Sequence, residues 1–243
     1  MSQFPIIVEF VGNPASGKST IARKLEEQLT AKGVKVRNRT HSLTHQTDSD
    51  YKRYSMMVGL ALLCILRHPV HSSQIARMIF KTQQRSLADF LTLTLYCLYL
   101  RTIYQRSASA SGVEIFDQGL FQSLWSILLT SNRKDISGLL RNIIDKYPGS
   151  PTHVVVLIEL SGEESISRLE NRNSNSSRLE EISNRNSDEA SDLCNQVYNN
   201  IREIVEDSSE RKESLSTITV STASYSSAES SNIVFKRVEE LYL

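Results

Sequence analysis

The chain has 243 residues, of which 40% are hydrophobic, and its formal net charge at pH 7 is +1. This length and apolar content favour one domain with a sizeable core and an elaboration over two independent domains. The near-neutral charge excludes a global electrostatic field that would gather nucleic acid, so we expect no nucleic-acid partner.

The cysteines and the apolar runs bear on the compartment. Cys64, Cys97 and Cys194 are far apart and odd in number, and the first two sit in apolar runs. This pattern favours buried free thiols in a reducing compartment. The first strand begins almost at the N-terminus, which leaves no room for a signal peptide. The longest apolar runs, Met56–Leu66 and Leu91–Leu100, are too short to span a bilayer, so we expect a cytoplasmic protein.

Five apolar or β-branched runs predict β-strands, and the segments between them are long enough for crossover helices. This alternation predicts an α/β fold in which helices cover both faces of a five-stranded parallel sheet. The first helix is expected to end at Gly33. The predicted strands are Ile6–Val11, Val34–Asn38, Val113–Asp117, His153–Leu160 and Ser216–Ser221.

The segment between the second and third strands is much longer than one crossover helix requires. Two stretches, Tyr51–Arg67 and Gln74–Tyr104, predict helices with a break around His68–His71. A structureless loop of this length would be unusual in a compact domain. We therefore predict a helical insertion over residues 48–110 within a single domain spanning residues 1–243. Its aromatic side chains favour packing between helices, and a lid over a lipophilic acceptor is the alternative.

The C-terminal part of the chain is rich in serine but is interrupted by the β-branched run Thr217–Val220. We therefore predict a loop, the last strand, another loop and a final helix instead of disorder. Val234, Val238 and Leu241 would give that helix an apolar stripe.

Residues 12–20, Gly-Asn-Pro-Ala-Ser-Gly-Lys-Ser-Thr, match the phosphate-binding loop pattern G-x-x-x-x-G-K-[ST]. The strand before the loop and the helical pattern after it provide the context that this motif requires. Glycines let the loop curl so that its N–H groups point inward, and the helix N-terminus adds a positive dipole end. The motif predicts a P-loop NTPase fold that binds ATP and Mg²⁺. The nucleotide-binding candidates are Gly12, Asn13, Pro14, Ala15, Ser16, Gly17, Lys18, Ser19 and Thr20.

Two further signals favour phosphoryl transfer. Asp117 ends the third strand, where a second carboxylate that organises Mg²⁺ is expected; helix capping is the alternative role. After the fourth strand, Ser161–Ser165 has the pattern of a helix start, and Arg168 and Arg172 follow on one helical face. With Arg178, these arginines suit a lid over residues 168–187 that closes on phosphates. The alternative is a solvated face paired with glutamates.

In this order, these segments resemble the thymidylate kinase and deoxynucleoside kinase family. Residues 152–180 are similar to that family's fourth strand, acidic helix start and arginine-bearing lid. The phosphate loop, with Asn13 and Ala15, is similar to the deoxynucleoside kinase form. The resemblance covers nearly the whole chain apart from the insertion, and it implies an ATP-dependent kinase.

The acceptor half of the chain departs from the family pattern. Pro14 stands where thymidylate kinases carry an acid, and Arg37–His41 replaces the Glu-Pro element that follows the family's second strand. Gln118 stands where the family has an arginine that holds the acceptor. Because a second anionic phosphate favours a guanidinium, Gln118 argues against a nucleoside monophosphate acceptor.

Other side chains are weaker candidates for the acceptor side. Arg37 and Arg39 end the second strand and are candidates to bind an anionic substrate. His41 could act as a base at neutral pH, although a histidine in a polar loop is more often solvated. Glu9 interrupts the first strand, where a structural role is favoured, so Asp117 is the preferred acid near the acceptor hydroxyl.

We predict an ATP-dependent phosphotransferase that passes the γ-phosphoryl group to a nucleoside, a nucleotide or another small molecule. The alternative is an ATP-binding regulatory or interaction protein that has lost acceptor chemistry. A kinase acting on nucleic-acid ends is disfavoured by the neutral charge, and a homodimer is left open. The catalytic candidates are Lys18, Asp117, Arg168, Arg172 and Arg178, and the Mg²⁺ candidates are Ser19 and Asp117.

Overall fold

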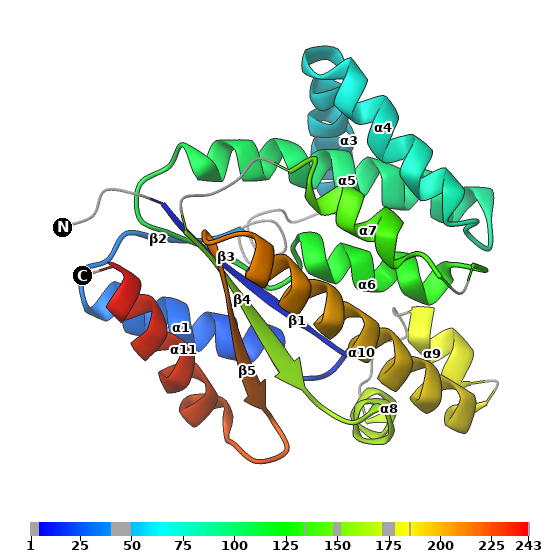
Figure 1. Cartoon of the computed structure of the whole chain (residues 1–243). Helices are drawn as coiled ribbons and strands as arrows, with labels where there is room; N and C mark the ends of the chain where they lie inside the picture. The colour runs from blue at the N-terminus through cyan, green and yellow to red at the C-terminus, as the bar shows by residue number, and fades with distance from the viewer. Residues whose placement is uncertain are drawn as a thin grey trace.

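The computed structural model describes residues 5–39, 50–133, 135–147, 152–171, 178–184 and 186–242. Its centre is a five-stranded sheet with the order β2-β3-β1-β4-β5, and neighbouring strands are parallel (Figure 1). The prediction of an α/β fold with a five-stranded parallel sheet is confirmed. The strands are β1 Ile6–Gly12, β2 Val36–Asn38, β3 Val113–Phe116, β4 Thr152–Glu159 and β5 Leu215–Ser221.

Helices cover both faces of this sheet, as Figure 1 shows. Helices α1 and α11 pack on one face, and α5, α6 and α10 are among those on the other. In chain order the helices are α1 Lys18–Ala31, α3 Asp50–Arg67, α4 Pro69–Lys81, α5 Leu87–Ala108, α6 Leu120–Thr130, α7 Ser137–Ile144, α8 Gly162–Glu170, α9 Arg178–Ser183, α10 Ser187–Arg211 and α11 Ser227–Tyr242.

Strand β1 explains why both faces need cover. Side chains of a strand alternate between the two faces of its sheet. Ile7 and Val11 therefore enter the core under α5 and α6, whereas Val8 and Phe10 enter the core under α1 and α11. The sequence of a parallel strand that is buried on both faces is a continuous apolar run, and this run is the pattern that predicted β1.

The last helix has the apolar stripe that its sequence predicts. Val234 and Val238 are fully buried against the sheet, and Leu241 is partly buried beside them. The predicted loop, strand, loop and helix order of the C-terminal region is confirmed.

The helices between β2 and β3 differ from their predicted bounds. A single helix over Gln74–Tyr104 is wrong, because α4 ends at Lys81 and α5 begins at Leu87. The Ser86 hydroxyl accepts the Asp89 N–H at 3.0 Å and thereby caps α5. The break predicted around His68–His71 is also too wide. Proline fits the first position of a helix, and α4 begins at Pro69 directly after His68.

No single helix in the described parts of the chain is long and apolar enough to cross a bilayer. Only two of the described helices, taken together, would be long and apolar enough, namely residues 54–67 of α3 and residues 69–81 of α4. The chain bends by 117° between them.

The three cysteines are buried and free, as predicted for Cys64 and Cys97. Burial raises the pKa of the Cys97 thiol to about 11 and that of Cys194 to about 12. Because the thiolate is the reactive form, we expect the native protein to react very slowly with iodoacetamide at pH 8 and the urea-unfolded protein to react fully. Mass spectrometry of the labelled protein would measure this, and rapid labelling of native Cys97 or Cys194 would contradict it.

Candidate functional site

The phosphate-binding loop lies at the carboxyl end of the central strand, β1, and leads directly into α1. Ala15 and Gly17 have left-handed backbones, with φ of +58° and +89°. Such turns direct successive N–H groups to one side and make an anion-binding concavity. For Ala15 this conformation costs about 1–2 kcal/mol, so the loop carries backbone strain. At Gly12 a Cβ atom would lie 2.7 Å from the Ile158 carbonyl oxygen, so only glycine fits between β1 and β4.

Asn13 ties the loop to the surrounding core. This side chain is fully buried. Its amide donates to the Leu160 carbonyl oxygen at 3.1 Å and accepts the indole N–H of Trp125 at 3.3 Å. Trp125 is buried, as predicted, and also holds the loop. Because the Asn13 side chain is hydrogen-bonded to both Leu160 and Trp125, it fixes the position of the loop.

Two further contacts anchor the loop, and sequence reasoning missed both. The Ser165 hydroxyl of α8 donates to the Pro14 carbonyl oxygen at 2.6 Å. The Gln122 side chain of α6 accepts the Gly12 N–H at 3.2 Å. Both partners lie more than a hundred residues away in sequence, and no local pattern signals such pairs.

The Lys18 ammonium folds back into the loop. It donates to the carbonyl oxygens of Gly12 and Asn13, each at 2.8 Å, and lies 3.4 Å from the Ser16 hydroxyl. The positive charge is thereby held at the concavity formed by the loop N–H groups, which is where a polyanion would bind.

The structure brings Ser19 and Asp117 together, 98 residues apart in sequence. The Ser19 hydroxyl, on the first turn of α1, donates to Asp117 Oδ2 at 2.7 Å. Asp117 follows β3, whose last residue pairs with Glu9 of the neighbouring β1, so the sheet register places it beside the loop. Asp117 is 7% exposed, and its Oδ1 atom has no hydrogen-bond partner among the described residues.

Tyr96 of α5 lies beside this carboxylate. Its hydroxyl donates to the Gln118 carbonyl oxygen at 2.9 Å, and its ring stacks on Tyr99 with centroids 6.0 Å apart. Burial, then the nearby Tyr99 and Asp117, raise the pKa of Tyr96, so the phenol stays a neutral donor. From the sequence, Tyr96 and Tyr99 were predicted only to pack between helices. No local sequence pattern indicates that α5 lies next to the end of β3.

The lid candidates are only partly described. The Arg168 guanidinium pairs with Glu164 at 2.6 Å and lies 3.4 Å from the Thr222 carbonyl oxygen. This is the glutamate pairing considered as the alternative to a lid role. Arg172 lies outside the described residues, and Arg178 begins α9 with its side chain undescribed. A catalytic role for these arginines therefore stays a prediction.

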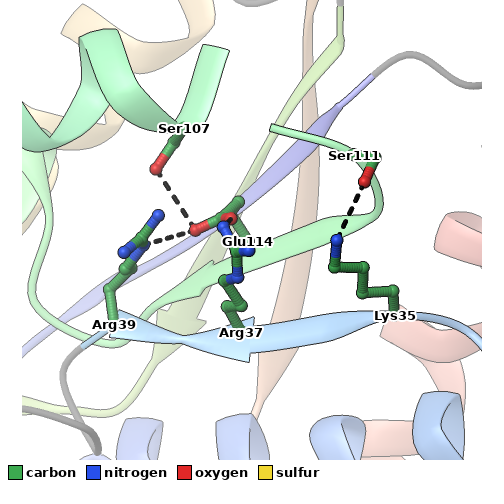
Figure 2. Close-up of polar contacts among 6 residues, drawn as sticks. All are labelled: Lys35, Arg37, Arg39, Ser107, Ser111 and Glu114. Atoms are coloured by element: carbon green, nitrogen blue, oxygen red, sulfur yellow. Dashed lines mark hydrogen bonds and ion pairs between the residues drawn. The ribbon is translucent and has the colours of Figure 1, made fainter. Parts of the chain in front are cut away.

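Arg37 and Arg39 meet a buried carboxylate (Figure 2). Arg37 lies 3.4 Å from Glu114 of β3, and Arg39 forms a close ion pair with the same side chain. The Ser107 hydroxyl donates to Glu114 at 3.2 Å. Both guanidiniums thus have a protein partner, and their binding of an anionic substrate stays a prediction. His41, the weaker base candidate, lies outside the described residues.

Glu9 occupies a buried network that supports the structural role favoured for it. Its carboxylate accepts the Phe121 N–H and the Tyr104 hydroxyl, each at 2.5 Å, and lies 3.3 Å from His153 Nε2. Burial, then the Glu9 charge and hydrogen bond, raise the pKa of Tyr104 well above 10.0, which keeps this hydroxyl a donor.

Within the described residues, no group of three or more histidine, cysteine, aspartate or glutamate side chains could hold a metal ion. The Ser19 and Asp117 oxygens are hard ligands of the kind Mg²⁺ prefers. Mg²⁺ usually binds through one or two carboxylates together with waters and substrate phosphates. The unpartnered Asp117 oxygen therefore fits a nucleotide-bound Mg²⁺ better than an all-protein metal cage.

No protein family matches the chain, and no curated protein does. Solved structures that are similar to the chain along nearly its full length include the following two. The crystal structure of APE1195 has a TM-score of 0.46 and 14% identity, covering 100% of this chain and 99% of its own. The structure of YorR from Bacillus subtilis, in complex with phosphorylated GDP, has a TM-score of 0.47 and 16% identity, covering 96% and 95%. Similarity at this level does not assign a ligand or a reaction.

Proposed function

We propose that this chain binds Mg-ATP at residues 12–20 and transfers the γ-phosphoryl group to a small-molecule acceptor. The observation that carries this proposal is the 2.7 Å contact between Ser19 and Asp117 next to the phosphate-binding loop. The second Asp117 oxygen is buried and unpartnered among the described residues, which supports a role in cation binding.

The loop would supply most of the phosphate binding. Its inward-facing N–H groups and the α1 N-terminus offer donors and partial positive charge to the phosphates. Lys18 would exchange the carbonyl oxygens of Gly12 and Asn13 for phosphate oxygens. Ser19 and Asp117 would hold the Mg²⁺, whose positive charge would offset that of the phosphates.

Phosphoryl transfer needs mainly positioning and charge stabilisation. Asp117 lies at the carboxyl ends of the strands, where an acceptor in an α/β fold approaches. Tyr96 places a neutral phenol near the same carboxylate. Arg168, Arg172 and Arg178 are proposed to close over the transferring group. The family resemblance supports ATP-dependent phosphorylation and leaves the acceptor open, and Gln118 disfavours a nucleoside monophosphate.

Two measurements on the purified protein test this function. Calorimetric titration with Mg-ATP or Mg-GTP should give saturable heat, and absence of heat with both would overturn the proposal. Incubation with radiolabelled Mg-ATP and pooled nucleosides, nucleotides and other hydroxyl compounds should then yield a labelled product. Tight ATP binding without transfer to any acceptor would favour the regulatory alternative instead.

Asp117→Asn should raise the Mg²⁺ concentration needed for half-maximal activity, and it should change the affinity for metal-free ATP much less. The amide keeps the shape of the carboxylate but loses its charge. Changes even to residues that only orient a metal's ligands typically lower metal affinity or activity by about 10- to 100-fold, so we expect at least this loss. Titrating Mg²⁺ at fixed ATP would measure the shift. Asp145→Asn is the matched control, because Asp145 pairs with Lys212 on the surface. Equal Mg²⁺ dependence in the two variants would remove Asp117 from the metal site.

A further inference from the structure

The large apolar side chains most exposed to solvent gather on one part of the described chain. The six large apolar side chains with the highest exposed fractions all lie on α3, α4 and the start of α5. Each of them is more than half exposed. Monomeric proteins rarely leave large apolar patches uncovered without a role in binding. We call this the hairpin surface; its six defining residues are Tyr51, Tyr54, Leu66, Val70, Phe80 and Leu87.

The hairpin surface lies away from the nucleotide site. Helices α3 and α4 stand on the side of α5 opposite the sheet (Figure 1). On α3, Ala61 and Cys64 are buried in the core, while Tyr51, Tyr54 and Leu62 recur on the exposed side. The inner side of α3 therefore packs against the core, and the exposed apolar stripe is free to contact a surface outside this chain.

The charge of the same segment is one-sided. From Tyr51 to Ala88 the sequence has no aspartate or glutamate but six lysines and arginines, although the whole chain is nearly balanced with 28 basic and 27 acidic residues. Among the described side chains of this segment, these cations form no ion pair. They are Lys52, Arg53, Arg67, Arg77, Lys81 and Arg85, of which the Arg53 side chain is outside the description.

A buried cation adds to this charge near the turn between α3 and α4. Arg101 of α5 is 5% exposed, and its Nε and Nη1 atoms have no hydrogen-bond partner in the described structure. His68, at the turn, lies 3.0 Å from Gln105, one helical turn beyond Arg101. Burial, followed by electrostatic interactions with Arg101, His68 and Lys146, lowers the pKa of His71. The turn thus lies near one buried cation of α5, Arg101.

We propose that the α3–α4 hairpin docks on a membrane surface that contains anionic phospholipids. Exposed apolar side chains together with unpaired lysines and arginines are the combination that binds the headgroup region of such a bilayer. A second copy of the chain is a poor occupant, because residues 51–88 of two identical surfaces would oppose cations with cations, and the nearest carboxylates, Asp50 and Asp89, lie only at the edges of this segment. This docking does not depend on the proposed kinase activity.

Co-sedimentation of the full chain with vesicles tests the docking. We expect at least about tenfold stronger partitioning onto phosphatidylcholine–phosphatidylserine vesicles than onto phosphatidylcholine alone, with a loss of binding in high salt. Equal partitioning onto both vesicle types, or none, would overturn the proposal. An excess of inorganic phosphate should compete weakly, because the apolar part of the surface requires a bilayer.

Two double variants separate the apolar and electrostatic contributions. Arg77→Gln with Lys81→Gln should reduce partitioning about tenfold or more, and Leu66→Ser with Val70→Ser should reduce it on every vesicle type. Lys236→Gln with Arg237→Gln on exposed positions of α11 is the matched control for charge and should change little. Circular dichroism confirms folding of each variant. If the control lowers binding as much, or if Leu66→Ser with Val70→Ser converts a dimer to a monomer, the occupant is not a membrane.

Discussion

Lys18→Ala should lower phosphoryl transfer by about a thousandfold or more, the scale associated with losing a cation that stabilises transferring phosphoryl charge. The Lys18 ammonium lies 2.8 Å from two loop carbonyl oxygens and needs only to exchange them for phosphate oxygens. Alanine removes the cation and keeps the helix that carries it. Initial rates with saturating acceptor and a range of Mg-ATP concentrations would show whether turnover, ATP affinity or both change.

A control on the same helix makes this result specific. Lys24 is also on α1, where its ammonium donates to the Ser227 hydroxyl at 2.8 Å, on the α11 side of the molecule. Lys24→Ala removes the same charge and the same side-chain atoms, and it should leave turnover nearly unchanged. If Lys18→Ala keeps most of the activity, or if both variants lose it equally, the proposed phosphate contact of Lys18 is wrong.

The sequence predicted the central features of the fold because they depend on local patterns. A strand buried on both faces reads as an apolar run, and the glycine loop between a strand and a helix has fixed spacing. Chain geometry then places Ser19 on α1, and the sheet register places Asp117 beside it. Residue type and position in the motif and after the third strand therefore suffice to indicate both residues as Mg²⁺ candidates.

The pairs that hold the site could not be predicted in the same way. The hydrogen bonds from Trp125 to Asn13 and from Ser165 to the Pro14 carbonyl oxygen join segments that only the folded chain brings together. The pairing of Arg39 with Glu114 has the same character. Their side chains have other common roles in a sequence, as core, cap or solvated charge, so residue type alone did not indicate these partners.

The break between α4 and α5 is a different case, because a local signal was present. Ser86 followed by Asp89 three residues later is a helix-start pattern, and Gln83 before it has a φ of +55°. Residues 81–86 carry no large apolar side chain, but Phe80 and Leu87 on either side of them are seven residues apart, which is a helical spacing, so one long helix was predicted. Here the turn chemistry decides the structure, and hydrophobic patterning does not.

Glu9→Ala should lower the free energy of unfolding by about 2–6 kcal/mol, because two buried donors would each lose their acceptor at a cost of about 1–3 kcal/mol. Glu9 is fully buried and accepts two hydrogen bonds, from the Phe121 N–H and the Tyr104 hydroxyl, beside His153. Alanine would leave both donors without their acceptor in the core. Urea unfolding followed by tryptophan fluorescence would measure the change in midpoint and slope.

A graded pair of variants distinguishes this structural role from catalysis. Tyr104→Phe removes one hydrogen bond to Glu9 and should cost about 0.5–3 kcal/mol, less than Glu9→Ala. Glu9→Gln keeps the size of the side chain and an acceptor for Phe121 N–H, so enough protein should fold for kinetics. If the carboxylate acts only in the network, folded Glu9→Gln keeps its turnover while its unfolding midpoint falls. A collapse of turnover with an unchanged midpoint would instead place Glu9 in the reaction, with Asp117 no longer the preferred acid.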